Sequence, residues 1–162
     1  MEKLDKEILA LLADDSRLTA KKIAAALGAD AKAVEERIRK LEDDGVIVKY
    51  TAIENSDLTD DDLVEALIEV KVTPQRGAGF DAIAQEIAAN SEVKNLYLMS
   101  GGYDLAVMVE CKSLKDVSRF VYEKISTYDT VISTATHFIL KKYKVEGALM
   151  KKGGENRLSI QA

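Results

Sequence analysis

The middle of the chain carries two apolar, strand-like runs on either side of a glycine-rich turn, in the segment LYLMSGGYDLAVMVE, residues 96–110. Gly-Gly between two such runs is a common signal for a β-hairpin. The pattern therefore predicts two strands, at 93–100 and 104–112, that are joined by the turn Gly-Gly-Tyr.

Strand-like and helical spacing alternate around this hairpin. Apolar residues recur at every second position over 64–72, which predicts a strand, and at helical spacing over 80–88 and 114–125. A long run rich in β-branched residues at 130–144 predicts a final strand. The order βαββαβ predicts an α+β fold, a ferredoxin-like split βαβ domain.

The first 43 residues have helical spacing only. Apolar positions fit three helices, which we expect at 3–13, 20–27 and 31–43. Thr19 and Asp30 are suited to cap the second and third helices, and Gly28 and Gly45 to end them. Two helices joined by a tight glycine turn and braced by a third predict a helix-turn-helix, although a plain three-helix bundle has the same spacing.

We expect four segments along the chain. Residues 1–53 form a winged helix-turn-helix, with 46–53 as an extended segment or wing, and 54–63 form an acidic linker. Residues 64–146 form the ferredoxin-like domain. The tail, 147–162, has a flexible Gly-Gly joint followed by RLSIQA, for which a short edge strand and a disordered end both stay open. The linker lacks the glycine and terminal glutamate of an EF-hand, so we interpret its acids as solvated.

Composition is that of an ordinary globular protein, with 47% hydrophobic and 31% charged residues. No run of about 18 apolar residues is present, so we expect no transmembrane helix and no membrane partner. The single cysteine, Cys111, cannot form an internal disulfide and indicates a reducing cytoplasm. Because the net charge is −5, any surface that binds nucleic acid must be locally basic.

Catalytic and metal-binding patterns are not found in the sequence. It contains neither a phosphate-binding P-loop nor a cluster of Cys and His. The only histidine, His137, has no nearby His or Cys in the sequence, and we expect it to be a packed or interface residue. We therefore predict no enzymatic activity and no cofactor.

Short motifs are spread along both halves of the chain. Those of the first half are Leu4-Asp5, Ile8-Leu9, Leu12, Asp15-Ser16-Arg17, Ile23-Ala24, Leu27-Gly28, Arg37-Ile38, Leu41-Glu42, Gly45-Val46-Ile47 and Tyr50. Those of the second half are Gly101-Gly102-Tyr103-Asp104 and the strand 131–140. With these motifs in this order, the chain resembles the Lrp/AsnC (feast/famine) transcription regulators from residue 4 to about residue 144.

The resemblance implies a function as well as a fold. It implies a winged helix-turn-helix that binds double-stranded DNA, followed by a βαββαβ ligand-binding domain. Such domains pair through their sheets into homodimers, which often assemble into octamers. Amino acids or related small metabolites bind at interfaces between these domains, and the glycine-rich turn and the final strand contribute to the cleft.

The third predicted helix would enter the major groove, where Arg and Lys contact phosphates or guanine edges. The candidate DNA-binding cations are Arg17, Lys21, Lys22, Lys32, Arg37, Arg39 and Lys40. Glu35 and Glu36, however, stand where relatives commonly carry polar or basic residues. Acids outnumber bases over 30–44, so we expect each domain to bind DNA weakly. Two or more linked DNA-binding domains would recover the affinity. An amino-acid sensor with a vestigial helix-turn-helix is the alternative.

The turn offers groups that suit an amino acid. Gly101 and Gly102 allow positive φ and a close approach of backbone N–H groups to a carboxylate. Asp104 is suited to pair with an α-amino group. The candidate effector-binding residues are Ser100, Gly101, Gly102, Tyr103, Asp104, Thr134 and Thr136. The alternative is a hairpin turn selected only for its geometry, with threonines that are simply good strand formers.

Overall fold

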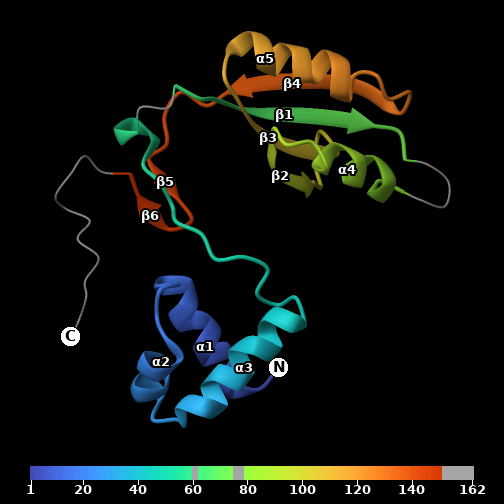
Figure 1. Ribbon diagram of the computed structural model, residues 1–162. Helices are drawn as coiled ribbons and strands as arrows, with labels where there is room; N and C mark the ends of the chain where they lie inside the picture. Colours follow the sequence, from blue (N-terminus) through green and yellow to red (C-terminus); the bar gives the residue numbers. More distant parts are fainter. Residues whose placement is uncertain (60–61, 75–78, 151–162) are drawn as a thin grey trace. The chain divides into compact units, whose positions relative to one another are not determined.

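The computed structural model describes residues 1–59, 62–74 and 79–150 (Figure 1). It divides into two compact units, Met1–Ile53 and Glu54–Ala162. Each unit has its own cluster of buried apolar side chains, so each is described by itself. No helix of the described residues is long and apolar enough to cross a membrane.

The first unit consists of the three expected helices. They are α1 (Lys3–Asp14), α2 (Ala20–Leu27) and α3 (Ala31–Asp43). Thr19 accepts a hydrogen bond from the Lys22 N–H, and Asp30 accepts one from the Ala33 N–H at 2.9 Å. Gly28 adopts the left-handed conformation, with φ of 64°, and ends α2. The predicted caps are therefore confirmed, and they set the sharp turn between α2 and α3.

The core of the helical unit is small. It consists of Ile8, Leu12, Ile23, Ala24, Val34 and Leu41. Because these residues recur at helical spacing, each helix turns one face toward the other two. The segment 46–53 follows α3 without a strand assignment, and Ile47 packs against the core from it.

The second unit contains one four-stranded antiparallel sheet. Its elements are β1 (Val64–Val72), α4 (Asp81–Ala88), β2 (Val93–Leu98), β3 (Leu105–Cys111), α5 (Leu114–Phe120), the π-helical turn η2 (Val121–Ile125) and β4 (Val131–Phe138). The strand order is β2-β3-β1-β4. This order confirms the predicted ferredoxin-like domain, in which the two central strands come from different βα halves.

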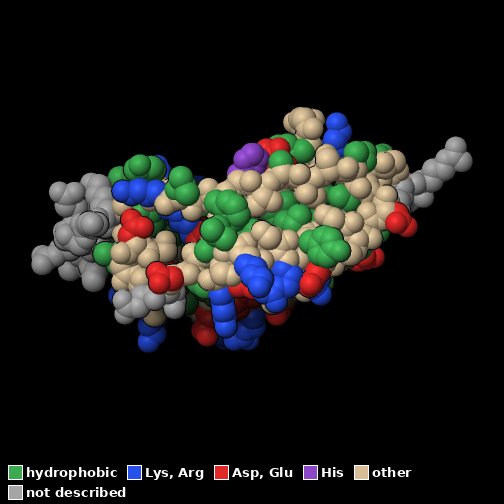
Figure 2. Space-filling model, turned by 90° about the horizontal axis from the view of Figure 1, so that it is seen from above, with side chains coloured by type: hydrophobic (Ala, Val, Ile, Leu, Met, Phe, Trp, Pro, Cys, Tyr) green, Lys and Arg blue, Asp and Glu red, His purple; other side chains and the backbone are tan. Residues whose placement is uncertain are grey.

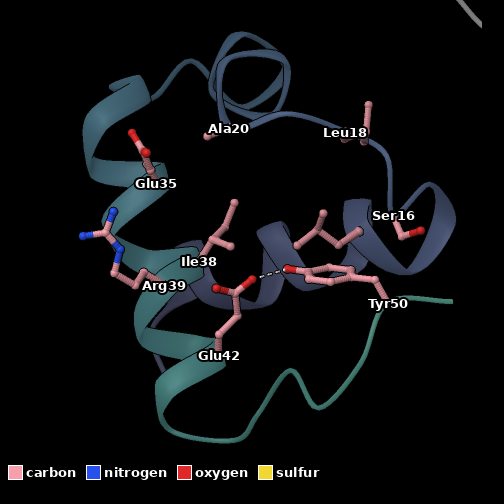
Figure 3. Close-up of a pocket in the computed structure, with 9 residues that line it drawn as sticks. Ser16, Leu18, Ala20, Glu35, Ile38, Arg39, Glu42 and Tyr50 are labelled. Carbon is pink, nitrogen blue, oxygen red and sulfur yellow. Dashed lines mark hydrogen bonds between the residues drawn. The ribbon is translucent and has the colours of Figure 1, made fainter.

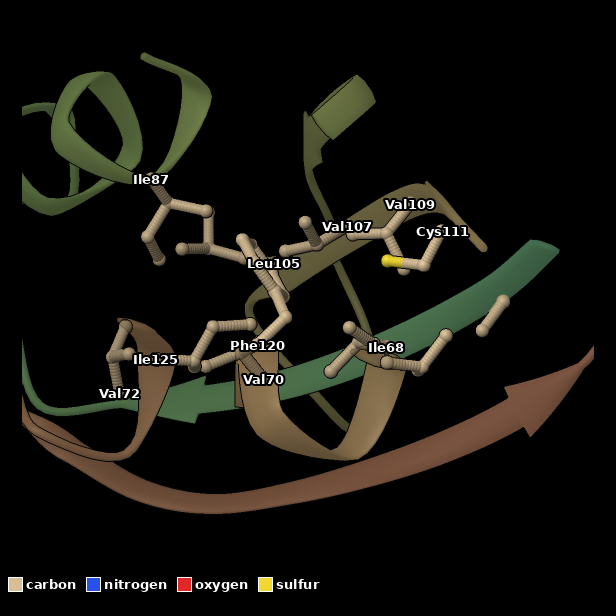
Figure 4. Close-up of a cluster of buried hydrophobic side chains, with 12 residues drawn as sticks. Ile68, Val70, Val72, Ile87, Leu105, Val107, Val109, Cys111, Phe120 and Ile125 are labelled. Atoms are coloured by element: carbon tan, nitrogen blue, oxygen red, sulfur yellow. The ribbon is translucent and has the colours of Figure 1, made fainter. Parts of the chain in front are cut away.

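One face of the sheet is buried against the helices (Figure 4). Alternate residues of β1 and β3, among them Ile68, Val70 and Val107, lie on this face because side chains alternate along a strand. Ile87 of α4 and Phe120 of α5 pack onto them. The core thus fixes the positions of the strand ends, where the predicted ligand turn begins.

The end of the last strand differs from the expectation. We expected a strand at 130–144, but β4 ends at Phe138. A separate hairpin follows, β5 (Lys144–Val145) and β6 (Ala148–Leu149), whose two turn residues, Glu146 and Gly147, both have positive φ. The tail segment RLSIQA, for which an edge strand and a disordered end were both left open, lies outside the described residues.

Candidate DNA-binding and ligand-binding sites

Exposed lysines and one arginine lie on α2 and α3 of the helical unit. Lys21 and Lys22 belong to the first turn of α2, and Lys32, Arg39 and Lys40 belong to α3. All five side chains are exposed. They are thus accessible to phosphate groups. Glu35 and Glu36 on α3 are exposed as well, which weakens the positive potential of that helix.

Arg37 differs from the other cations of α3 because its guanidinium is bound inside the unit. Its Nε lies 2.9 Å from Asp5 Oδ1, and it also pairs with Glu2. Only 22% of the Arg37 side chain and 10% of the Asp5 side chain are exposed. The hydrogen bond that Arg37 donates to Glu2 raises the pKa of Arg37 and lowers the pKa of Glu2. Arg37 therefore holds α1 against α3, and we leave it out of the proposed DNA contacts.

Arg17 pairs with an acid in the loop between α1 and α2. Its Nε lies 2.9 Å from Asp15 Oδ1, and its backbone N–H donates to the same oxygen at 3.0 Å. These bonds lower the pKa of Asp15 to about 2. Because 60% of the Arg17 side chain is exposed, this ion pair can rearrange at little cost, and Arg17 stays a candidate phosphate contact.

A cavity of about 300 Å³ opens beside α3 (Figure 3). Its lining includes Leu12, Leu18 and Ile38, and the Tyr50 hydroxyl donates to Glu42 Oε1 at 2.9 Å across it. Burial, and then the bond to Glu42, raise the pKa of Tyr50. This contact holds the segment that follows α3 against that helix. Sequence reasoning missed the cavity, since periodicity does not show where a segment without regular structure packs.

The predicted ligand turn joins β2 to β3 and is closed by one residue, Asp104. The Met99 N–H donates to the Asp104 carbonyl at 2.8 Å, and the Asp104 N–H donates to the Val70 carbonyl at 3.0 Å. The Asp104 carboxylate accepts a hydrogen bond from the Val72 N–H at 2.8 Å. The turn is thereby attached to the end of β1.

The two glycines of the turn do not use the positive φ that glycine allows. Neither Gly101 nor Gly102 has a positive φ, and a Cβ atom at either would meet no heavy atom within 4 Å. The geometry of the turn therefore does not require glycine at either position. Ser100 and both glycines are exposed, and Tyr103 is half-buried. The turn is open to solvent, so its backbone is accessible to a ligand.

Thr134 and Thr136 lie on β4 and share one face, as expected. Thr134 is opposite Val70 and Thr136 is opposite Ile68, so both point to the helix-covered face and are half-buried. Val70 is opposite Leu105 on its other side, so Thr134 lies in the same row across the sheet as the residue that follows Asp104. Thr136 is two residues further from the turn.

His137 lies on the opposite, open face of β4. Its Nε2 is 3.3 Å from Glu69 Oε1. In Figure 2 the histidine borders an acidic side chain and exposed hydrophobic ones. No cluster of three or more potential metal ligands occurs among the residues that the structure describes. The interaction with Glu69 accounts for the position of the His137 ring.

Comparison with known proteins decides the family. Residues 65–149 match the Lrp/AsnC ligand binding domain, and residues 1–48 match a winged helix-turn-helix DNA-binding domain. The chain belongs to the Lrp/AsnC family. An uncharacterized HTH-type transcriptional regulator of Bacillus subtilis, YugG, is 45% identical over 94% of this chain and 93% of its own length. Another such regulator, from Pyrococcus furiosus, is 35% identical over 89% and 94%.

Solved structures agree with the fold. The crystal structure of MtbAldR has a TM-score of 0.75 and 26% identity, and the match covers 91% of this chain and 99% of that one. A transcriptional regulator from Neisseria meningitidis, solved as a complex with L-Met, has a TM-score of 0.70 and 23% identity over 90% and 93%. This Lrp/AsnC chain is therefore a transcriptional regulator with a ligand-binding domain, in a family of regulators rather than enzymes.

Proposed function

We propose that this Lrp/AsnC protein binds specific DNA sequences and that an amino acid or related small metabolite, bound to its second unit, changes that binding. The observation that carries the proposal is the combination of an exposed basic surface on α2 and α3 with a solvent-open turn at one end of the sheet. Control of DNA binding by a small molecule requires two distinct sites, one for the DNA and one for the effector.

The proposed DNA surface consists of the exposed cations of the helical unit. They are Arg17, Lys21, Lys22, Lys32, Arg39 and Lys40. Neutralisation of phosphates supplies most of the non-specific affinity for DNA. With the acids Glu35 and Glu36 among these cations, one unit binds weakly. A homodimer or larger homo-oligomer would place two or more readers on one DNA and restore the affinity.

The proposed effector site lies between the turn Ser100–Tyr103 and β4. Backbone N–H groups of the turn would bind the carboxylate, and the hydroxyls of Thr134 and Thr136 would bind polar atoms of the effector. The L-Met complex of the Neisseria meningitidis regulator supports an amino acid as the chemical class. Half-burial of Tyr103 at the turn provides an apolar wall for a side chain.

Fluorescence anisotropy of the full chain tests this proposal. Labelled DNA from upstream of its own gene and a shuffled sequence are titrated with the protein at two salt concentrations, with and without each of the twenty amino acids. We expect tighter binding to the upstream DNA and at least one amino acid that shifts its affinity. Equal affinity for both DNAs at low salt would contradict the DNA part of the proposal.

A second candidate function is an amino-acid sensor whose helix-turn-helix no longer binds DNA. One observation favours it: of the four bases on α3, Arg37 is engaged by Asp5 and Glu2, while Glu35 and Glu36 are exposed. Calorimetry with amino acids, performed beside the anisotropy titration, separates the two. Heat of amino-acid binding without DNA affinity under any ligand condition would favour this candidate.

A further inference from the structure

Asp104 already has hydrogen-bond partners within the protein, unlike a residue whose polar groups are free to bind a ligand. Its N–H, its carbonyl and one carboxylate oxygen are all engaged, with Val70, Met99 and Val72 respectively. Its side chain is half-buried. We infer that Asp104 is a positioning residue, whose carboxylate fixes the turn Ser100–Tyr103 to β1, and that it is not the partner of the effector's amino group.

The carboxylate replaces a missing strand partner. The pairing of β1 with β3 ends at Val70, which is opposite Leu105, and β1 continues for two more residues. The register between β1 and β4 also shifts between Lys71 and Val72. The buried Val72 N–H therefore has Asp104 Oδ2 as its acceptor, at 2.8 Å. An unsatisfied buried N–H is costly, which makes this bond a strong restraint on the turn.

This restraint also fixes the turn relative to the last strand. Val70 bonds to the Asp104 backbone on one side and is opposite Thr134 of β4 on the other. A molecule that contacts both the turn and the β4 hydroxyls needs a fixed separation between them. This step rests on the proposed effector site, whereas the attachment of the turn to β1 does not.

Asparagine and alanine distinguish positioning from charge pairing. Asp104→Asn keeps an oxygen that accepts the Val72 N–H and removes the charge, whereas Asp104→Ala removes both. Asp129→Asn serves as the matched control, because Asp129 is an exposed aspartate of the same unit outside the turn. In all variants the full chain is used.

Hydrogen exchange of the peptides that contain Val72 and the turn measures the attachment directly. We expect Asp104→Asn and Asp129→Asn to exchange as the wild type does, and Asp104→Ala to exchange about tenfold faster, the factor for one lost hydrogen bond. Exchange in Asp104→Ala at the wild-type rate would overturn the inference. If Asp104→Ala does not fold, Asp104→Asn still tests whether an oxygen at this position is sufficient to hold the turn. Exchange in Asp104→Asn that is tenfold faster than in the wild type would overturn the inference.

Calorimetry with L-methionine and with 4-(methylsulfanyl)butanoate, which lacks the amine, tests the role toward a ligand. If Asp104 positions the turn, Asp104→Asn keeps wild-type affinity for L-methionine within about threefold. If it pairs with the amine, Asp104→Asn loses L-methionine affinity about tenfold and leaves the amine-free analogue unchanged, which would overturn the inference. If no amino acid binds the wild type, the proposed effector site fails, and the exchange measurement still decides the role of Asp104.

Discussion

The two units present their candidate functional groups in opposite ways. In the helical unit they are long, exposed cations whose availability depends on which acid lies nearby, as Arg37 and Lys40 show. In the sheet unit they are backbone groups and short side chains, held in place where strands end. Charge on a helix therefore indicates little about DNA contacts until the intramolecular partners of each side chain are known, whereas the turn between β2 and β3 is positioned by strand pairing and by the Asp104 carboxylate.

The hydrophobic cores of the two units differ in size. Six buried residues form the described core of the helical unit, against twelve in the sheet unit. Because stability is the small difference between large terms, the smaller core leaves less margin. We therefore expect the DNA-binding half to be the first to unfold.

A cavity in the smaller core has the largest expected effect. Ile23 is fully buried, and Ile23→Ala should cost about 3 kcal/mol of unfolding free energy. Calorimetric melting should show an early transition for the helical unit and an unchanged one for the sheet unit, and DNA binding should be lost. Ile68→Ala, in the core of the sheet unit, should instead lower the transition of the sheet unit. Loss of both transitions together in Ile23→Ala would show that the units do not fold independently.

Loss of Arg37 should lower the stability of the helical unit more than loss of a neighbouring cation. Arg37→Met leaves the largely buried Asp5 without its partner, whereas Lys40→Met removes an exposed charge. Thermal melting of the two variants measures this. Equal melting temperatures would mean that Arg37 is not a structural residue.

Acid should reduce the difference in stability between the wild type and Arg37→Met. The hydrogen bond from Arg37 lowers the pKa of Glu2 below its ordinary value of 4.5. A lowered carboxyl pKa adds stability above the unfolded-state value, and this stability is lost as the pH falls through the folded-state value. Melting temperatures measured from pH 7 downward should therefore converge below about pH 4.5. A gap that stays constant in acid would contradict the ion pair.

Single exposed lysines should affect DNA binding modestly. Lys40→Met should weaken binding to all sequences alike and reduce the slope of log affinity against log salt by about one. Anisotropy titrations at several salt concentrations give this slope. Glu36→Gln, on the same helix, should change the affinity in the opposite direction. An unchanged slope in Lys40→Met would place that residue away from the phosphates.

The thiol of Cys111 should report on the sheet unit alone. It is buried, and burial raises its pKa, so it should react slowly with a thiol reagent at neutral pH in the native state. Ile23→Ala should leave this labelling rate unchanged, and Ile68→Ala should increase it. Faster labelling in Ile23→Ala would show that the disturbance spreads between the units.

Local signals in the sequence were sufficient for the helices and for the order of helices and strands along the chain. Thr19, Asp30 and Gly28 act over three or four residues, which is why the boundaries of α2 and α3 were predicted correctly. The alternation of β1 likewise depends only on neighbouring residues. The end of β4 was wrong, since a β-branched run does not show where its partner strand stops.

Contacts between distant residues could not be predicted. The partner of Arg37 is Asp5, thirty-two positions away, and the same separation lies between Asp104 and Val72. Both residues were predicted to bind external ligands because their chemistry suits DNA or an amine. That chemistry suits an internal partner equally well, and only the packing of helices and strands decides between them.

Binding of the intact chain to DNA from upstream of its own gene, followed by anisotropy while amino acids are added one at a time, tests the central claim most directly. We predict binding that is weaker at higher salt, stronger for this DNA than for a shuffled sequence, and shifted by at least one amino acid. Binding without sequence preference at low salt, unaffected by all twenty amino acids, would contradict it.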